Sequence, residues 1–366
     1  MKKLSVMLVA GARPNFMKVA PVWRALRSSR RLTPVMVHTG QHYDFLMSDV
    51  FFRELGLPKP KVCLKAGSGT HAAQTSKILS GLEKIFLEKK PALVCVFGDV
   101  NSTVAAALAA AKLEIPVAHV EAGLRSGDRS MPEEINRILT DRLANFLFVT
   151  EPSGARNLKK EGVPASKIFH VGNVMIDTLF YHLPRIRRSL ILRKLHLKPR
   201  TYGVLTLHRP GNVDSRASLR RILHILRAVT SRIPLMYPIH PRSYKKIEAA
   251  GLWLDFKNLP GLCVIDPLGY TDFMKLTAEA AFVLTDSGGV QEESTALGVP
   301  CLTMRENTER PVTLEQGTNR LVGTDLKKII AAMDQALSKD RVKIRSPRFW
   351  DGKAAGRILK ILEIKL

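Results

Sequence analysis

The sequence predicts an α/β protein built from two doubly wound, Rossmann-like domains. The chain has 366 residues, a length that suits about two domains of ordinary size. Short, β-branched apolar segments alternate with helical patterns, as in βαβ units that form parallel sheets. This alternation occurs twice, and proline and basic residues interrupt it in the middle of the chain. Apolar residues make up 45% and charged residues 24%, which excludes a disordered chain or a small disulfide scaffold.

Each half of the chain contains five candidate strands. In the first half these are Ser5–Ala10, Pro34–His38, Leu93–Phe97, Val117–Val120 and Phe146–Thr150. In the second half they are Tyr202–Leu207, Leu235–Ile239, Leu262–Ile265, Phe282–Thr285 and Pro300–Thr303. We therefore expect a first domain over residues 1–172, a basic connector over 173–200 and a second domain over 201–350. We expect a helix within 351–366 to pack its apolar stripe back on the first domain.

The net charge of +25 suits an anionic partner but does not identify one. The densest basic run, Pro184–Arg200, holds seven Lys and Arg residues without an acid, and a solvated connector is favoured over an anion-binding patch. Four cysteines without a CxxC pair indicate a reduced, cytoplasmic protein. No apolar run approaches the ~20 residues of a membrane span. No basic and aromatic platform for nucleic acid is visible.

Ligands of open α/β sheets bind beyond the carboxyl ends of the strands, so the residues that follow each predicted strand are the candidates for a site. A glycine turn with Arg13 and Lys18 follows the first strand. GxGxxG and GxxxxGK[ST] are absent, which disfavours NAD and Walker-type ATP binding, and neither HExxH nor CxxC indicates zinc. Lys18 is expected in the first turn of the next helix, where a cation is unfavourable unless an anion lies between it and Arg13. The alternative is a surface turn.

Three carboxylates are candidates for proton transfer. Asp99 and Glu121 each follow a predicted strand, and Glu133 opens a helix. Asp99 could instead cap the following helix, and Glu133 could complement the helix dipole, with Glu134 paired to Arg137. Glu121 is a poor cap. Together, acids at one sheet edge beside the two cations suit proton transfer at a carbon next to a leaving anion.

The second half carries an anion-binding pattern. His208 follows a strand and can donate to a phosphate or move a proton, although a satisfied strand-end histidine is the alternative; His240 has the same placement. Ser287-Gly288-Gly289 connects a strand to a helix, which makes an anion site from backbone N–H groups. Glu293, about two turns on, can accept from ribose hydroxyls, and Arg310 supplies another cation.

Taken together, these motifs resemble the non-hydrolysing UDP-N-acetylglucosamine 2-epimerase family. The matching segments, in the family's order, are GARPNFMKVAP, GDVNST, HVEAGLRS, MPEEINR, LHRP, TDSGGVQEE and ENTERP, and they span Gly11 to Pro311. The resemblance implies a GT-B-like pair of domains with the active site in the interdomain cleft, and a homodimer. It also implies reversible conversion of UDP-N-acetylglucosamine to UDP-N-acetylmannosamine without NAD or metal, by anti elimination of UDP and re-addition through 2-acetamidoglucal.

The resemblance assigns roles residue by residue. It implies that the catalytic residues are Asp99, Glu121, Glu133 and His208. It implies substrate contacts from Arg13, Lys18, Leu268, Phe273, Ser287, Gly288, Gly289, Glu293 and Arg310. Gln41, His42 and His240 are expected at the cleft or at a second site. The chain departs from many members at Ala12 and Asn15, and Gly67–Lys77 differs from the members that bind a second substrate molecule as an activator.

Three other functions fit parts of the sequence. A 2-epimerase for another UDP-linked acetamido sugar, such as a diacetamido uronic acid, would suit the basic balance through the extra carboxylate of its substrate. A UDP-sugar glycosyltransferase needs an acceptor site, and no Glu-x7-Glu pattern stands in the expected nucleotide loop. An inactive nucleotide-sugar-binding regulator is disfavoured because the acids and His208 are intact.

Overall fold

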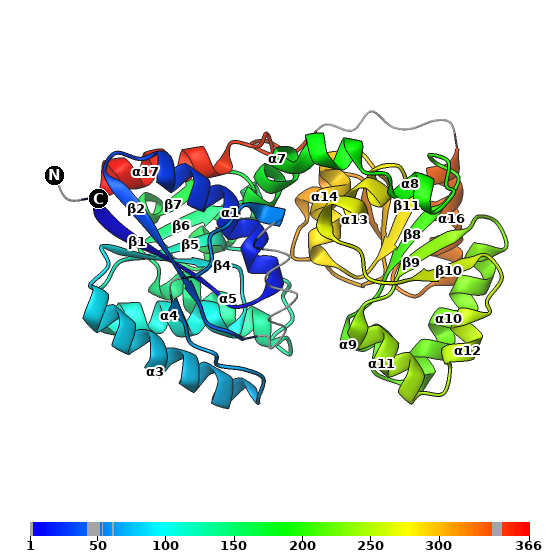
Figure 1. The fold of residues 1–366 in the computed structure, drawn as a ribbon, viewed down its shortest axis with the longest axis horizontal. Coiled ribbons are helices and arrows are strands. Elements are labelled where there is room, and N and C mark those ends of the chain that lie inside the picture. Colours follow the sequence, from blue (N-terminus) through cyan, green and yellow to red (C-terminus); the bar gives the residue numbers. More distant parts are fainter. Residues whose placement is uncertain (1–2, 42–51, 53, 61, 339–345) are drawn as a thin grey trace. The chain divides into compact units, whose positions relative to one another are not determined.

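The computed structural model of the chain describes residues 3–41, 52, 54–60, 62–338 and 346–366. The chain forms two compact units: unit 1 comprises Met1–Leu179 and Arg348–Leu366, and unit 2 comprises Phe180–Pro347. In each unit a parallel sheet is packed against helices (Figure 1). The prediction of two doubly wound α/β sheets is therefore confirmed. The chain passes from unit 1 to unit 2 within helix α7 (Val174–Arg188).

Unit 1 contains, within the described residues, a seven-stranded sheet in the order β3-β2-β1-β4-β5-β6-β7. Its strands are β1 (Leu4–Ala10), β2 (Leu32–His38), β3 (Val62–Cys63), β4 (Leu93–Phe97), β5 (Val117–Ala122), β6 (Phe146–Val149) and β7 (Ile168–His170). Besides α7, the helices described in this unit are α1 (Arg13–Ser28), α3 (His71–Lys89), α4 (Asn101–Lys112), α5 (Pro132–Leu143), α6 (Pro152–Lys160), the 3-10 helix η1 (Ala165–Lys167) and α17 (Ala354–Lys365). Helices α3, α4 and α5 cover one face of the sheet, and α1 and α17 the other (Figure 1).

Unit 2 contains, among its described residues, a six-stranded sheet in the order β10-β9-β8-β11-β12-β13. Its strands are β8 (Gly203–Thr206), β9 (Leu235–Pro238), β10 (Leu262–Ile265), β11 (Phe282–Thr285), β12 (Cys301–Thr303) and β13 (Asn319–Leu321). Its helices include α8 (Ile191–Lys194), α9 (Pro210–Val213), α10 (Arg216–Thr230), α11 (Pro241–Ala249), α12 (Trp253–Lys257), α13 (Tyr270–Ala278), α14 (Gly288–Leu297), α15 (Val312–Glu315) and α16 (Leu326–Leu337).

The local sequence explains these elements. Strand β4 reads LVCVF and is buried along its whole length, as a central parallel strand should be. Helix α4 is rich in alanine, a strong helix former whose small side chain lets the helix lie close to the sheet and to its neighbours. The sequence does not predict the edge strands β3, β7 and β13, because they have two or three residues and, unlike β12, are not buried throughout, so they form no apolar run.

The strand order places one topological switch point in each unit. In unit 1 the chain reverses direction across the sheet between β1 and β4, and in unit 2 between β8 and β11. Loops diverge at such a point, which leaves a crevice at the carboxyl ends of the two strands. In unit 1 this place is formed by the turn after β1 and by Gly98, which follows β4. In unit 2 it is formed by the turn after β8 and by Asp286, which follows β11.

The C-terminal segment completes unit 1. Helix α17 packs against α1, at the left of Figure 1. Trp350 is buried and its indole N–H donates to the carbonyl of Thr150 at 3.2 Å. The carboxylate of Asp177 accepts from the backbone N–H groups of Ala354 at 3.0 Å and Ala355 at 2.7 Å, which satisfies the start of α17. In the sequence, the boundaries between the units fall after Leu179 and after Pro347, whereas the expected boundaries are at 172 and 350.

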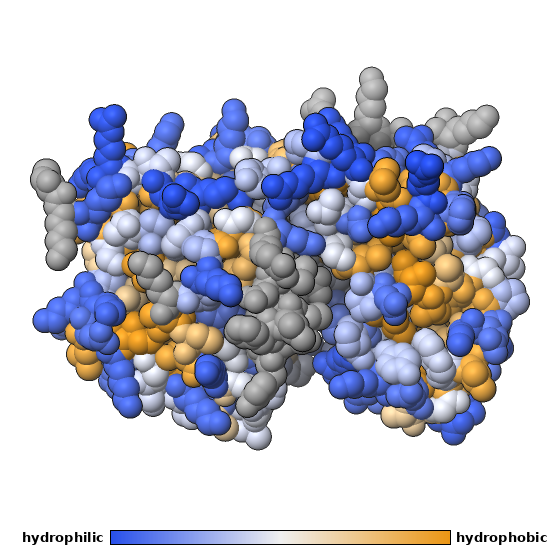
Figure 2. Space-filling model, in the orientation of Figure 1, coloured by the Kyte–Doolittle hydropathy of each residue, from blue (hydrophilic) through white to orange (hydrophobic). Residues whose placement is uncertain are grey.

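The basic run around α8 carries a strongly hydrophilic surface. Figure 2 shows such side chains over the region that α7 and α8 occupy in Figure 1. None of the helices that the structure describes has the length and apolar character needed to span a bilayer.

The cap on α17 should make the stability of unit 1 depend on pH. Burial raises the pKa of Asp177 to about 6, against the two backbone N–H groups, which lower it. Between about pH 4 and pH 6 the folded chain keeps a proton that the unfolded chain has released, so the free energy of unfolding falls as pH rises through this window. The side chain of Asp177→Asn does not titrate. Relative to this variant, we expect the free energy of unfolding of wild type to be about 2 kcal/mol higher near pH 4.5 than near pH 7.5. Urea unfolding at both pH values tests this, and an equal difference at both would contradict it.

Candidate functional site

A buried ion pair lies at the switch point of unit 1. Lys18 Nζ is 2.5 Å from Glu121 Oε2, and both side chains are more than nine-tenths buried. The sequence predicts Lys18 in the first turn of α1, but the structure places it in the second. The reason is that the helix already begins at Arg13, where the Asn15 side chain accepts from the N–H of the N-cap residue Ala12 at 3.1 Å. The anion beside Lys18 is thus a protein carboxylate. The side chain of Arg13, the first residue of α1, lies outside what the structure describes.

Glu121 lies on a β-bulge. The prediction that it follows its strand is wrong: β5 continues to Ala122, and the register against β6 shifts between Val120 and Ala122. Glu121 has a φ of 78°, in the left-handed region that non-glycine residues rarely adopt. Such a residue costs about 1–3 kcal/mol and persists only where its surroundings hold it. A bulge also turns the side chain away from the direction that the regular strand would give it.

The turn after β4 makes room for the ion pair. Gly98 has a φ of 64°, and a Cβ atom at this position would lie 2.8 Å from Lys18 Nζ. Next in the chain, the carboxylate of Asp99 pairs with Arg137 Nη2, and its carbonyl accepts from Asn136 Nδ2 at 2.9 Å. Asp99 does not cap α4, whose N-cap residue is Val100, so that structural alternative is wrong.

Helix α5 connects these acids. The expected pair between Glu134 and Arg137 is confirmed, at 2.6 Å. Glu134 also accepts from the N–H groups of Ser126 and Gly127, so it holds the loop before α5. Glu133, half-buried, lies one turn before the arginine that binds Asp99.

The polar residues after β2 are tied to α4. Gln41 is buried, and its Oε1 accepts from the backbone N–H of Ser102 at 3.2 Å and from its hydroxyl at 2.6 Å. This explains a structural role for Gln41 at the start of α4. His42, the other residue expected here, lies outside the described residues.

The switch point of unit 2 is organised by Asp286, which follows β11. Its carboxylate accepts from the backbone N–H of His208 at 3.0 Å, from that of Arg209 at 2.9 Å and from Asn212 Nδ2 at 3.0 Å. His208 Nδ1 lies 3.1 Å from Asp286 Oδ1. Burial alone raises the pKa of Asp286, but the bonds from His208, Asn212 and Arg209 outweigh burial and hold the pKa below its usual range. A carboxylate fixed at Nδ1 leaves the Nε2 edge of His208 for a ligand.

His208 combines a fixed ring with solvent access. Its side chain is 37% exposed, so it is not a buried strand-end histidine. The ring of His240 lies 5.6 Å from it, centroid to centroid. His240 is the N-cap of α11, and its Nδ1 accepts from the N–H of Arg242 at 3.1 Å. The structure therefore brings these two predicted histidines together.

An anion cradle follows Asp286. Ser287, Gly288 and Gly289 open α14, whose first turn has no acid and whose N-cap makes no side-chain bond. A Cβ atom on Gly288 would lie 2.7 Å from Arg310 Nη1, so the guanidinium lies against this helix start. Backbone N–H groups, the positive end of the helix dipole and a guanidinium together form a site for a phosphate group.

Two acids fix the orientation of this guanidinium. Arg310 Nε is 2.7 Å from Glu292 Oε1, and Nη1 is 3.3 Å from Glu309 Oε2. Arg305 also binds Glu309, at 3.0 Å. Burial alone raises the pKa of Glu309, but Arg310 and Arg305 outweigh it and hold the pKa well below its usual range.

The remaining predicted contacts of unit 2 surround α14. Burial raises the pKa of Glu293 to about 8, against a hydrogen bond with the Tyr270 hydroxyl, which lowers it. The Glu293 carboxyl therefore carries a proton for much of the time near neutrality. Leu268 and Phe273 are half-buried and pack on the same apolar cluster as Val290 of α14.

Sequence reasoning missed the bonds that hold the site together. Asp286, Arg137 and Glu309 each fix a predicted site residue through a long-range or buried charged bond. The available signal was their place inside the motifs TDSGG, PEEINR and ENTERP. Asp286 and Glu309 lie next to residues that were singled out, and Arg137 was itself expected to pair with Glu134.

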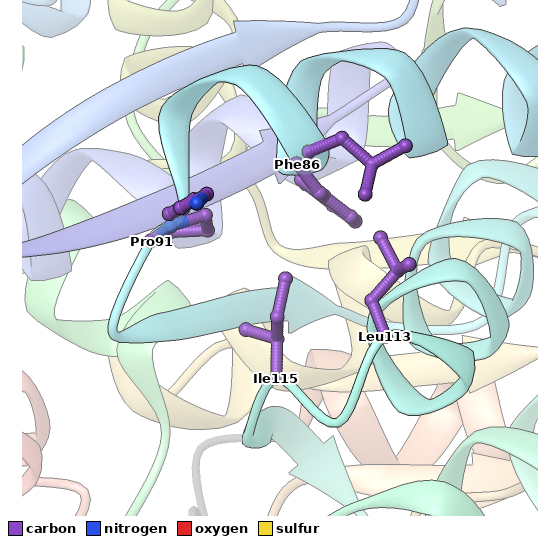
Figure 3. Close-up of a pocket in the computed structure, with 6 residues that line it drawn as sticks. Phe86, Pro91, Leu113 and Ile115 are labelled. Carbon is purple, nitrogen blue, oxygen red and sulfur yellow. The ribbon is translucent and has the colours of Figure 1, made fainter.

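Two other kinds of site are relevant besides the switch points of the two sheets. Within the described residues, no group of three or more His, Cys, Asp and Glu side chains is arranged to hold a metal ion. An apolar hollow lies where α3 and α4 end and β4 and β5 begin, lined by Phe86, Leu87, Lys90, Pro91, Leu113 and Ile115 (Figure 3). It is thus at the amino-terminal edge of the sheet, opposite the acids.

Comparisons with known proteins agree with this geometry. The sequence matches the family described as UDP-N-acetylglucosamine 2-epimerase over residues 24–363. A relative of that name from Methanocaldococcus jannaschii is 43% identical over 365 residues, which cover 98% of each chain. A UDP-2,3-diacetamido-2,3-dideoxy-D-glucuronate 2-epimerase from Pseudomonas aeruginosa is 40% identical over 362 residues, 98% of this chain and 99% of the relative.

Solved structures extend the match to three dimensions. The crystal structure of the M. jannaschii UDP-GlcNAc 2-epimerase in complex with UDP-GlcNAc and UDP matches with a TM-score of 0.92 at 42% identity. The match covers 99% of this chain and 100% of that one. The expected GT-B-like fold class is therefore confirmed.

Gly98 allows a test of the ion pair. In Gly98→Ala the new methyl group would lie 2.8 Å from Lys18 Nζ, so the ammonium group must shift within its ion pair with Glu121, in addition to the strain of a left-handed alanine. Gly162, with a φ of 79° and nothing within 4 Å of an added Cβ, is the matched control, because Gly162→Ala carries that strain alone. We expect Gly98→Ala to lower the free energy of unfolding by at least about 1 kcal/mol more than Gly162→Ala. Equal losses in denaturant titrations would show that the pair does not depend on this glycine.

Proposed function

Because the chain belongs to the UDP-N-acetylglucosamine 2-epimerase family, we propose that it interconverts UDP-N-acetylglucosamine and UDP-N-acetylmannosamine by epimerisation at carbon 2. One observation carries this proposal: acids gather at the switch point of unit 1, and an anion cradle with a fixed histidine lies at the switch point of unit 2. The reaction requires both sets of groups to act on one bound UDP-sugar, so the proposed active site includes residues from both units.

The chemistry explains why both sets are needed. A proton on a carbon beside an acetamido group is barely acidic, so it leaves only as the bond between carbon 1 and the UDP oxygen breaks. A carboxylate takes the proton, the electron pair forms the double bond of 2-acetamidoglucal, and UDP departs with the pair from carbon 1. Re-addition of UDP with a proton on the opposite face of carbon 2 gives the epimer. The same steps run in reverse.

Stabilising the departing diphosphate is the larger task. One well-placed donor to a developing anion is worth about 2.7–4 kcal/mol, and general acid–base help contributes typically about 10²–10⁴-fold. We assign the diphosphate to the Ser287 hydroxyl and the N–H groups of Gly288 and Gly289, with Arg310 beside them, because the N–H of Ser287 donates to Thr285 Oγ1. His208, its Nδ1 held by Asp286, presents Nε2 to the leaving oxygen.

The acids divide the proton transfers among them. Asp99, Glu121 and Glu133 are the proposed catalytic carboxylates, all from unit 1. Arg13 and Lys18 are proposed cations near the sugar phosphate, and Lys18 also holds Glu121. Further proposed contacts are Glu293 to ribose, Leu268 and Phe273 to the base, and Gln41, His42 and His240 around the substrate.

We further propose a cytoplasmic homodimer. All four cysteines are free thiols, two of them buried, which suits a reducing compartment. Apolar side chains of unit 1 are exposed at Leu87 on α3 (57%) and at Ile135 (45%) and Leu139 (49%) on α5, which suits a surface that a second copy covers. Light scattering should give a mass of two chains. A monomer at micromolar concentration would contradict the dimer.

Incubation in heavy water tests the reaction most simply. We expect the wild-type chain to convert UDP-N-acetylglucosamine to the manno isomer with deuterium at carbon 2, seen by proton NMR, without added NAD or metal. If deuterium enters UDP-2,3-diacetamido-2,3-dideoxy-D-glucuronate but not UDP-N-acetylglucosamine, the uronate is the substrate. Release of UDP with transfer of the sugar to an acceptor would indicate a transferase.

The ranking of the two tasks predicts a mutational order. We expect His208→Ala or Arg13→Ala to lower kcat at least as much as Glu121→Gln, since leaving-group stabilisation outweighs one proton transfer. His224→Ala, an exposed histidine on α10, is the control and should leave kcat unchanged. A His208→Ala enzyme with near-normal kcat would refute the role of the histidine.

A further inference from the structure

A buried histidine and a buried aspartate form hydrogen bonds around the bulge that carries Glu121. His119 lies on β5 two residues before Glu121, and its Nδ1 is 2.7 Å from Asp141 Oδ1. Its Nε2 is 2.8 Å from the carbonyl oxygen of Gly98. Both side chains are fully buried. The imidazole ring of His119 is therefore held at both nitrogens, by the carboxyl group of Asp141 on one side and the carbonyl of Gly98 on the other.

The second oxygen of Asp141 reaches the other side of the bulge. It accepts from the backbone N–H of Gly123, two residues after Glu121, at 3.1 Å. It also binds Arg125 Nη1 at 2.7 Å, and Arg125 in turn pairs with Glu161 at 2.8 Å. One carboxylate on α5 thus joins the residues on both sides of Glu121.

The same pair fixes the partner of Glu121. His119 holds the carbonyl of Gly98, the residue against which Lys18 Nζ packs. Gly123 has a φ of 78°, and a Cβ there would lie 2.4 Å from the carbonyl oxygen of Gly154, so the chain after the bulge passes too close to the backbone of Gly154 for any side chain. The bonds of His119 and Asp141 therefore restrain both ends of the Lys18–Glu121 pair.

We propose that His119 and Asp141 are positioning residues for the epimerase reaction, which hold Glu121 in its left-handed conformation so that its carboxylate stays at the sheet edge. This inference rests on the proposed function. Packing alone does not account for the pair, because burying an imidazole and a carboxylate is costly and apolar side chains of similar volume would fill the space at least as well. Directional bonds to Gly98 and Gly123 are what apolar residues would not supply.

The chain offers variants that separate geometry from charge. Asp141→Ala removes both bonds to the bulge. Asp141→Asn keeps them: its oxygen accepts from Gly123 and Arg125, and its N–H donates to His119, which then donates only to Gly98. His119→Gln keeps the hydrogen-bonding character but cannot span from Asp141 to Gly98. Glu161→Gln, at the outer end of the network, is the matched control.

The test compares turnover with binding. For Asp141→Ala and His119→Gln we expect kcat for UDP-N-acetylglucosamine to fall by about 10- to 100-fold, as for a misplaced reacting group, with KM and the calorimetric Kd for UDP little changed. Asp141→Asn should restore kcat to within about threefold of wild type, and Glu161→Gln should leave it unchanged. A purely structural role would lower the melting temperature without this split between kcat and KM.

Three results would overturn the inference. The first is a normal kcat in His119→Gln. The second is a loss of kcat in Asp141→Asn as large as in Asp141→Ala. The third is a loss of kcat in these variants that is accompanied by an equal loss of affinity for UDP. If Asp141→Ala does not fold, His119→Gln decides. If wild type does not epimerise the substrate, the proposed function fails, and the crystal structure of His119→Gln then decides the geometric claim: Glu121 should leave the left-handed region, and an unchanged φ would refute it.

Discussion

The ion pair between Lys18 and Glu121 is the interaction on which the proposed chemistry of unit 1 depends. It brings an acid from β5 and a cation from α1 together beneath the turn after β4, at 2.5 Å and out of water. Burying two charges is favourable only when the geometry is good and the backbone around them is fixed. The bulge with its left-handed Glu121 is the local cost of that geometry, whereas Gly98 adopts its positive φ without such strain. Strain of this kind is common where a fold holds a reacting group.

The two units use one topology for two chemical tasks. Each has a parallel sheet with a switch point, but the loops there differ in character. In unit 1 they carry carboxylates. Arg137 of α5 binds Asp99, and Asp141 of α5 binds the backbone of Gly123, two residues after Glu121. In unit 2 they carry a helix start with two glycines, an oriented arginine and a histidine fixed by Asp286. Acids and an anion cradle are the complementary halves that elimination of a diphosphate requires.

The sequence was enough to predict ten of the thirteen strands that the structure describes, the helix start at Ser287 and the local pair of Glu134 with Arg137, because these depend on neighbours in the chain. It was not enough to predict the long-range bonds. Asp99 and Arg137 are 38 residues apart, and His208 and Asp286 are 78 apart, so no periodicity connects them. The bulge at Glu121 also escaped prediction, since a glutamate with positive φ contradicts local preference and exists only because tertiary bonds enforce it.

A crystal structure of the wild-type chain with UDP-N-acetylglucosamine would test the account most directly. We predict the diphosphate on the Ser287 hydroxyl and the N–H groups of Gly288 and Gly289 beside Arg310, with His208 at the leaving oxygen. We also predict a carboxylate oxygen of Asp99, Glu121 or Glu133 within about 3.5 Å of carbon 2, the separation of a near-attack geometry. A sugar ring remote from all three carboxylates, or a diphosphate bound away from the start of α14, would contradict the account.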